Sequence, residues 1–418
     1  MSPPKHLGIP APISPISTSS AHLPRFSLAH EVRKYAFIDA LRGYAVLLVI
    51  ICHTGYAFTG LPYPIKKITS VGWHGVQLFF LISCVTLMMS WRSDERKGIS
   101  NAYSFWTRRF FRIAPMYYLA AVFYFLVEPP ATGFDPLQLL ASVAFLNAWH
   151  PLLVPTVAER WMVVPGGWSI GVEFTFYFLF PTIAIFIRSL KAATAFFISA
   201  IILACLSNMA VYDLLASRYG VTASSNFIYF WLPNQLPIFA LGTVLFFLID
   251  HLRHQQDGIA RLFRKAPNAV ILLCIAIFAL LAEFPSGITG TFHFSPTGLI
   301  PFLLLASLLF MAFSITLALN DRLLWTNRAI CALGEVSFSA YILHFFVLHQ
   351  LANWLPAVDT SSTGYAAIKS LVILVTCTVA LTFALSKLTY RFIEQPAIRF
   401  GSRMAGLFVR ICPPAVAS

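Results

Sequence analysis

The chain has 418 residues, of which 58% are hydrophobic and only 11% are charged, and its mean hydropathy is +0.75. Soluble globular domains carry about 25% charged residues, so this composition excludes an ordinary soluble protein. Transmembrane barrels are built from strands of about ten residues with alternating polarity, and no such pattern runs through the sequence. We therefore expect an all-α, polytopic helical membrane protein.

About ten stretches are apolar over the length that a bilayer requires, roughly 20 residues of helix. They lie in one membrane domain, residues 36–400, between a Pro- and Ser-rich tail, 1–35, expected to be disordered, and a short basic tail, 401–418. The Pro-rich loop 129–166 is expected to be an irregular outer cap, whose apolar part, 137–149, is re-entrant or interfacial. The expected spans are 38–58, 73–91, 113–128, 167–187, 193–215, 226–250, 268–284, 298–319, 336–353 and 367–388.

The distribution of positive charge orients these spans. If the N-terminus lies inside, the inner segments hold 24 of the 29 Lys and Arg residues. Cytoplasmic loops of membrane proteins are enriched in these residues, so both termini are expected in the cytoplasm. The net charge of +13 then follows from topology, and no basic soluble domain indicates a nucleic-acid partner. The residues left outside are Lys66, Lys67, Arg160, Arg218 and Lys369.

The cysteines are scattered, and none forms a C-x-x-C pair. This spacing favours small apolar packing residues over a disulfide framework or a zinc site. We expect neither a bound metal nor a bound cofactor. The seven positions are Cys52, Cys84, Cys205, Cys274, Cys331, Cys377 and Cys412.

The first span carries two costly polar side chains, Arg42 and His53. They are about three helical turns apart, so they share one face of the helix at a separation of roughly 16 Å along its axis. Ionisable groups inside a bilayer usually face a partner or a water-filled cavity. The pair therefore indicates a polar path that leads from the cytoplasmic end into the membrane. Asp39, before them, is expected to complement the start of the helix dipole.

Three arginines, Arg108, Arg109 and Arg112, alternate with aromatic residues before the third span. We expect a short interfacial helix that ends near Pro115. Arg109 and Arg112 are three residues apart and share a face. Guanidinium groups suit multidentate phosphate binding, and anchoring to lipid headgroups is the alternative.

Glu173 lies in the fourth span, in a run without other charges, about six residues below its outer end. His53 lies about five residues below the outer end of the first span, so counting along the two helices places both groups at similar depth. A carboxylate that orients an imidazole is a common acid–base arrangement. The alternative is a structural hydrogen bond between helices.

Other polar residues in the spans are expected to form hydrogen bonds between helices. Arg391 and Glu394 are spaced as an i,i+3 ion pair that locks the C-terminal end. The remaining polar residues are His74, Gln77, Asn234, Gln235, Tyr341, His344 and His349.

Taken together, these motifs resemble the acyltransferase-3 family of membrane acyltransferases. The resemblance covers about residues 36–400, and its strength lies in five motifs in the family's order. They are Arg42-x10-His53, the run 75–83, Arg109-x-x-Arg112-x-x-Pro115, Trp168-Ser-x-x-x-Glu173-x-x-x-Tyr177, and the closing Arg391-Phe-Ile-Glu-Gln-Pro.

The resemblance implies a bacterial inner-membrane enzyme that moves an acyl group, expected to be acetyl, from cytoplasmic acyl-CoA to a sugar hydroxyl. The acceptor would be a cell-surface polysaccharide or glycolipid. Arg42, Arg109 and Arg112 would bind acyl-CoA. His53 would be the general base or a transient acyl carrier, oriented by Glu173. Ser169, Trp168 and Tyr177 would support the site.

Two departures from the family pattern matter. Cys84 stands where the family usually has glycine, which bears on local helix packing. Many relatives also carry a C-terminal periplasmic esterase-like domain, and the present chain has only a short tail, so a second transfer would need a separate protein.

Acyl-CoA, a glycan or glycolipid acceptor and membrane lipids are thus the expected partners. The rival function is a proton-coupled transporter, because intramembrane His, Glu and Arg also build proton relays. The sequence shows none of the internal repeats that transporters often have. Acceptor choice is expected to depend on the outer cap, 129–166.

Overall fold

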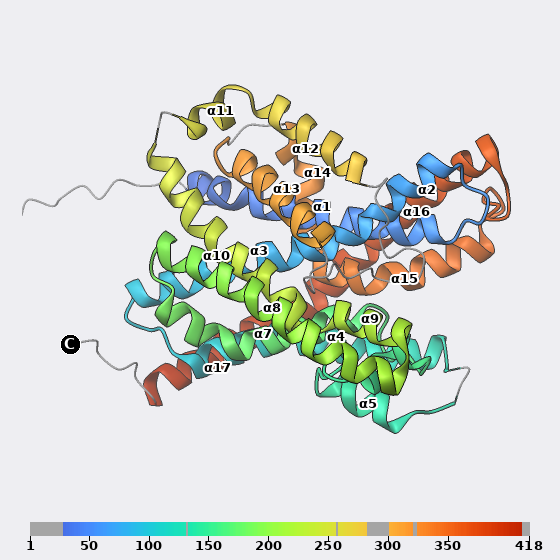
Figure 1. The fold of residues 1–418 in the computed structure, drawn as a ribbon, viewed down its shortest axis with the longest axis horizontal. Coiled ribbons are helices and arrows are strands. Elements are labelled where there is room, and N and C mark those ends of the chain that lie inside the picture. Colours follow the sequence, from blue (N-terminus) through green and yellow to red (C-terminus); the bar gives the residue numbers. More distant parts are fainter. Residues whose placement is uncertain (1–27, 131–132, 256–257, 282–300, 321–323, 412–418) are drawn as a thin grey trace, which may run out of the picture.

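The computed structural model describes residues 28–130, 133–255, 258–281, 301–320 and 324–411 (Figure 1). Throughout these ranges the chain is helical, apart from loops and one isolated β-bridge between Gly60 and Thr363. The first helix, α1 (Leu28–Tyr56), begins within the segment expected to be a disordered tail. Residues 1–27 and 412–418, at the two ends of the chain, lie outside the described residues.

The expectation of an all-α, polytopic membrane protein is confirmed. Seven of the described helices are long and apolar enough to cross a membrane, or up to nine if each of two sharply bent pairs is one span. A shorter apolar helix lies in the eighth expected span. Besides α1, the longer helices that contribute to these candidate spans are α3 (Gly75–Arg96), α4 (Ala102–Val127), α7 (Gly167–Phe186), α8 (Leu190–Tyr219), α10 (Leu232–His254), α12 (Pro267–Leu281), α15 (Ser337–Trp354), α16 (Gly364–Thr389) and α17 (Gln395–Ile411), and the shorter apolar helix is α13 (Pro301–Ala318).

Short helices connect these spans or bend them. The described part of the outer cap contains short helices, and α5 (Pro136–Val143) covers only the first part of the apolar stretch 137–149; its eight residues are too few to cross a bilayer. The other short elements are α2 (Tyr63–Ser70), η1 (Val71–His74), η2 (Pro151–Leu153), α6 (Pro155–Ala158), α9 (Val221–Phe230), α11 (Ile259–Lys265), η4 (Leu324–Thr326), α14 (Arg328–Glu335) and η5 (Tyr390–Glu394).

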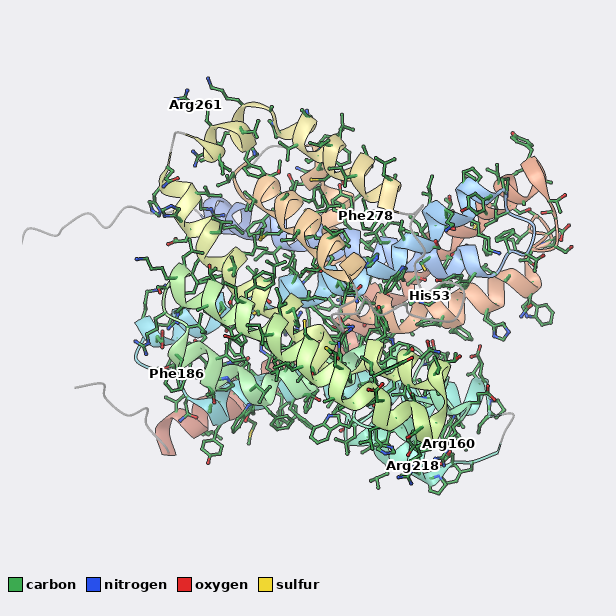
Figure 2. All side chains as sticks on the ribbon, in the orientation of Figure 1. His53, Arg160, Phe186, Arg218, Arg261 and Phe278 are labelled. Atoms are coloured by element: carbon green, nitrogen blue, oxygen red, sulfur yellow. The ribbon has the colours of Figure 1, made fainter. Side chains whose placement is uncertain are left out.

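The two ends of the bundle carry the charges that the topology predicts. Figure 2 shows Arg261, expected inside, at the same end as Phe186, the last residue of α7. Arg160 and Arg218, expected outside, lie together at the opposite end. The bundle therefore sorts these residues to opposite ends as the positive-inside pattern requires.

The prediction of a short interfacial helix before Pro115 is wrong. α4 runs without a break from Ala102 to Val127, with Pro115 inside it, so the three arginines and the third span share one helix. Proline removes one helical hydrogen bond. Ending the helix inside the membrane would instead free several backbone groups where no water can satisfy them, so continuation is the better solution.

α1 passes through the centre of the bundle and packs against α3, α14 and α15. Its crossing with α14 brings the two backbones into contact, since a Cβ atom added to Gly334 would lie 1.7 Å from the carbonyl oxygen of Asp39. Because α1 begins at Leu28, Asp39 lies well inside this helix, and its expected place at a helix start is wrong. This close crossing fixes the height and rotation of the helix that carries Arg42 and His53.

The predicted Arg391–Glu394 pair is also replaced by other contacts. Both residues lie in η5, a π-helical turn that joins α16 to α17. Glu394 is buried and accepts a hydrogen bond from the hydroxyl of Ser339 on α15. The Arg391 guanidinium lies over the ring of Phe392. The wider π turn changes the i,i+3 geometry on which the sequence-based prediction depended.

Candidate active site

Two adjoining cavities lie between the helices, and they have different chemical linings. The outer cavity, which His53 lines, has a volume of about 250 Å³. The inner cavity, which Arg42 and Glu173 line, has a volume of about 80 Å³. Both are lined by Val76 and Tyr341, so these two residues stand between them. The sequence predicted a single polar path, and the structure divides it into two compartments.

The inner cavity gathers the three predicted acyl-CoA-binding arginines. Arg42 reaches it from α1, and Arg109 and Arg112 reach it from α4. Arg42 Nη2 donates to Thr86 Oγ1 at 3.3 Å. The Arg109 guanidinium stands over the Phe105 ring, and its buried Nε has no hydrogen-bond partner among the described residues.

Glu173 lies in the same inner cavity, which changes its expected role. Its carboxylate accepts hydrogen bonds from the Ser83 hydroxyl and, at 2.7 Å, from the Tyr177 hydroxyl. Its charge also attracts Arg42 and Arg109. The hydrogen-bonded partners of Glu173 are therefore on α3 and α7, and the prediction that it directly orients His53 is wrong.

Equal residue counts from two helix ends correspond to equal depth only if both ends lie in one plane. Glu173 is six residues from the start of α7, whereas His53 is three residues from the end of α1. The structure places them in different compartments, Glu173 in the inner cavity and His53 in the outer one.

His53 faces the outer cavity, whose walls are mainly aromatic. Its ring contacts three others, with centroid distances of 6.1 Å to Tyr56, 5.4 Å to His344 and 4.5 Å to Phe345. The outer cap supplies one wall, which includes Asn147 and Met162. The other lining residues are Val49, Trp73, Pro155, Val164, Gly166, Gly167, Trp168, Tyr229 and Phe230.

The supporting residues divide between the two compartments. Trp168 lines the outer cavity and packs its ring against Phe230 at 4.7 Å. Tyr177 lines the inner cavity and donates to Glu173. Ser169 lies at the boundary, because its hydroxyl donates to the carbonyl of Gly166 and is 2.8 Å from the hydroxyl of Tyr341.

Tyr341 and His344 are the residues whose importance the sequence understated. Both were expected only to hold helices together, yet Tyr341 separates the cavities and His344 lies directly behind His53. A tyrosine and a histidine three residues apart share a helix face, which was the available signal. Which other helix that face meets is a tertiary fact that one sequence does not contain.

The expected helix–helix hydrogen bonds are found for several other polar residues. Gln77 Nε2 donates to Tyr229 Oη at 3.0 Å, and Asn208 Nδ2 donates to Asn234 Oδ1 at 3.1 Å. His349 forms a pair with Glu128 at 2.6 Å, at the outer end of α15. These contacts connect different elements of the bundle, as predicted.

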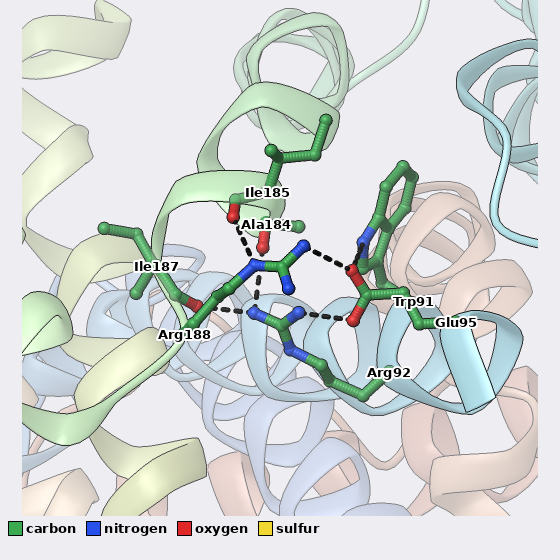
Figure 3. A network of polar contacts seen from close by, with 7 residues as sticks. All are labelled: Trp91, Arg92, Glu95, Ala184, Ile185, Ile187 and Arg188. Carbon is green, nitrogen blue, oxygen red and sulfur yellow. Dashed lines mark hydrogen bonds and ion pairs between the residues drawn. The ribbon is translucent and has the colours of Figure 1, made fainter. Parts of the chain in front are cut away.

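α7, which carries Ser169, Glu173 and Tyr177, is held at its inner end by a polar network (Figure 3). Arg92 of α3 donates to the carbonyl oxygens of Ala184 at 2.8 Å and Ile187 at 2.6 Å, two of the acceptors that a helix end leaves free. Glu95 forms ion pairs with Arg92 and Arg188. The network therefore fixes α7 against α3.

Among the described residues, no group of three or more His, Cys, Asp or Glu side chains is arranged to hold a metal ion. The polar side chains that line the two cavities include guanidinium, carboxylate, hydroxyl and imidazole groups. A basic inner compartment joined to a histidine-bearing outer one, within a bundle of membrane-spanning helices, has the parts of a membrane-embedded group-transfer enzyme.

Comparison with known proteins identifies the class of transfer. The sequence pattern of the family described as "Acyltransferase domain" matches residues 35–391. The chain is 25% identical over 394 residues to acyltransferase MdmB of Streptomyces mycarofaciens, covering 88% of this chain and 92% of that protein. It is 22% identical over 393 residues to O-acetyltransferase OatA of Staphylococcus aureus, covering 90% of this chain but 59% of that protein. No solved structure matches the chain.

The protein is therefore a multi-pass membrane acyltransferase. It belongs to the acyltransferase-3 family, as its five motifs predicted.

Proposed function

We propose that this protein transfers an acyl group, in the first instance acetyl, from cytoplasmic acyl-CoA to a sugar hydroxyl. The acceptor is a cell-surface polysaccharide or glycolipid, and the enzyme works in the bacterial inner membrane. The name of the relative OatA, an O-acetyltransferase, supports transfer to oxygen. The charge distribution of this chain supports a donor that enters from the inner side.

The convergence of three arginines on a cavity with one carboxylate carries the proposal. Arg42, Arg109 and Arg112 line the inner cavity, and Glu173 is the acidic side chain among its lining residues. Asp39 and Glu394, outside the lining, also interact electrostatically with these arginines. Cations inside a membrane protein are costly, and they usually mark an anionic substrate or a charge pathway. Guanidinium groups form strong, often bidentate bonds to phosphate, so the phosphates of coenzyme A fit this cluster of cations.

The second cavity supplies the acceptor side. His53 faces a space of about 250 Å³ with aromatic walls, at the end of the bundle expected to face the periplasm. Aromatic rings provide flat, amphipathic surfaces that can lie against a sugar ring. The cap residues Asn147 and Met162 then contribute to acceptor choice.

The reaction follows from these placements. A ring nitrogen of His53 takes the proton from the acceptor hydroxyl while the hydroxyl oxygen attacks the thioester carbon. The C–O bond forms, the C–S bond breaks, and the coenzyme A sulfur leaves with the proton that His53 received.

Neighbouring arginines of α4 provide a matched test. Arg109 lines the inner cavity, whereas Arg108 is paired with Asp94 on α3. Replacing Arg109 with Ala should weaken acetyl-CoA binding about tenfold or more, because a hydrogen bond to a charged group contributes about 1.5–3 kcal/mol. Isothermal titration of the purified protein measures this, with Arg108→Ala expected within twofold of wild type. Equal affinities in both variants would instead assign these arginines to lipid anchoring.

A further inference from the structure

A second buried histidine lies behind His53, outside the cavity lining. His344 of α15 is completely buried, and its ring centroid is 5.4 Å from that of His53. The two helices that carry these residues pack together in the bundle. Neither the proposed mechanism nor the known relatives' names assign His344 a role.

The hydrogen bond of His344 fixes which ring nitrogen carries a proton. Its Nδ1 atom lies 2.7 Å from the backbone carbonyl oxygen of Tyr341. A carbonyl oxygen can only accept a hydrogen bond, so Nδ1 must be the donor. In the neutral ring Nε2 is then an unprotonated acceptor. This atom is buried and has no hydrogen-bond partner among the described residues.

A buried acceptor without a partner is unfavourable unless some state of the molecule satisfies it. The rings in contact with His344 are those of Tyr341, Phe345 and His53. Phe345 has no polar atom, and the Tyr341 hydroxyl is engaged with Ser169 and Gly166. His53 is the neighbour whose ring gains a second N–H during the reaction.

We propose that His344 is a positioning residue for His53, an inference that rests on the proposed function. A turn of either ring, whose centroids are 5.4 Å apart, brings the Nε2 atom of His344 to an N–H of His53, a hydrogen bond that the structure itself does not contain. The other ring nitrogen of His53 then presents its lone pair to the outer cavity. When that lone pair takes the acceptor's proton, both ring nitrogens of His53 carry protons. The N–H directed at Nε2 then donates to it more strongly, because it belongs to a cation.

The same arrangement returns the proton without a net change. The imidazolium of His53 gives the proton from its cavity-facing nitrogen to the departing coenzyme A sulfur, and His344 keeps its Nδ1 proton throughout. His344 therefore has the role of orienting His53, which was expected of Glu173. A histidine in this place adds no carboxylate charge beside His53, whereas the carboxylate of Glu173 lies among the arginines of the inner cavity.

Two substitutions at position 344 separate the functions of its two nitrogens. His344→Asn keeps a donor near the position of Nδ1 and removes the acceptor at Nε2. His344→Gln places a side-chain amide near the position of Nε2. We expect His344→Asn to lower kcat for acetyl transfer about tenfold or more, with an unchanged KM for acetyl-CoA, and His344→Gln to retain more activity. A control is His349→Asn, since His349 lies on the same helix and pairs with Glu128 at the surface.

A spectroscopic measurement tests the inference without relying on activity. In protein labelled with ¹⁵N-histidine, the ring signals of His53 are assigned by their loss in His53→Asn. Wild type should show one neutral tautomer for His53, and His344→Asn should show a mixture, while His349→Asn leaves the signals unchanged. An unchanged His53 tautomer in a folded His344→Asn protein would overturn the inference. If wild type transferred no acetyl group, the proposed function would fail, and this measurement would still decide whether His344 positions His53.

Discussion

Cys84 and Gly242 are complementary residues at the contact between α3 and α10. Cys84, which replaces the family's usual glycine, is completely buried. A Cβ atom added to Gly242 would lie 2.7 Å from the Cβ atom of Cys84 and 2.7 Å from the carbonyl oxygen of Leu81. The side chain on α3 therefore fills the space that the missing side chain on α10 leaves open.

The fit between Cys84 and Gly242 predicts that substitutions at the two positions have coupled effects on stability. Gly242→Ala should destabilise the protein by about 1–3 kcal/mol through overpacking. Adding Cys84→Gly should recover part of that loss, with a coupling energy of about 0.5–3 kcal/mol, since the two residues are in contact. Unfolding of the four proteins in detergent measures the coupling. Gly406→Ala is the control, because nothing lies within 4 Å of its added Cβ atom. Strictly additive effects would contradict the packing argument.

Sequence reasoning located individual polar residues better than their partners. Arg42, Arg109 and Arg112 were predicted to act together, and the structure brings all three to one cavity. Spacing within a helix determines which side chains share a face, so the pairing of Arg109 with Arg112 needed only local geometry. Their grouping with Arg42 of α1 came from the family resemblance. The partners of Glu173 and His53 depend instead on how α7, α1 and α15 are shifted along one another, and one sequence does not record that shift.

Among the helices, α7 depends on α3 for the position of its inner end. Arg92 satisfies two of its last carbonyl groups and is itself paired with Glu95, as Figure 3 shows. Arg96 lies one turn further along α3 and has no such contact with α7 among the described residues. The two arginines thus differ mainly in whether they hold α7.

We expect Arg92→Ala to destabilise the protein by about 1–3 kcal/mol, because it leaves helix-end carbonyl groups without their donors. A lower midpoint of thermal unfolding in detergent is the readout. Arg96→Ala, which removes the same charge from the same helix, should shift the midpoint much less. Equal shifts in the two variants would mean that charge alone, and not the bond to α7, stabilises this end.

Element types were predicted well, and element ends less so. Ten expected spans all fall on helices, where these are described, because length and hydropathy determine what can cross a bilayer. Pro115 was treated as a helix end, whereas α4 continues past it. The π turn at 390–394 left no trace in the composition. Both features depend on packing against neighbouring helices, which local propensity does not include.

At the scale of the whole molecule, topology determines which substrate reaches which cavity. The arginine-lined cavity should open towards the cytoplasm and the His53 cavity towards the periplasm. Ser361 lies in the exposed loop between α15 and α16, at the expected outer side, and Arg261 lies at the expected inner side.

A cysteine placed at each of these positions tests that orientation. Ser361→Cys should react with a membrane-impermeant maleimide in intact spheroplasts, whereas Arg261→Cys should react only after permeabilisation. Unmodified protein provides the background, since the described native cysteines are buried or half-buried. Labelling of Arg261→Cys in intact spheroplasts would reverse the orientation and with it the assignment of the two cavities.

In the proposed mechanism, His53 drives transfer of an acyl group from coenzyme A to a glycan oxygen. Inside-out membrane vesicles that contain the protein receive acetyl-CoA labelled in its acetyl group, and alkali-labile label is measured in the glycan fraction. We predict labelling with wild type and with His349→Ala, and a loss of about 100-fold or more with His53→Ala, whose acetyl-CoA affinity is retained. Normal labelling by His53→Ala, or uptake of a solute by wild type with no labelled glycan, would contradict the account.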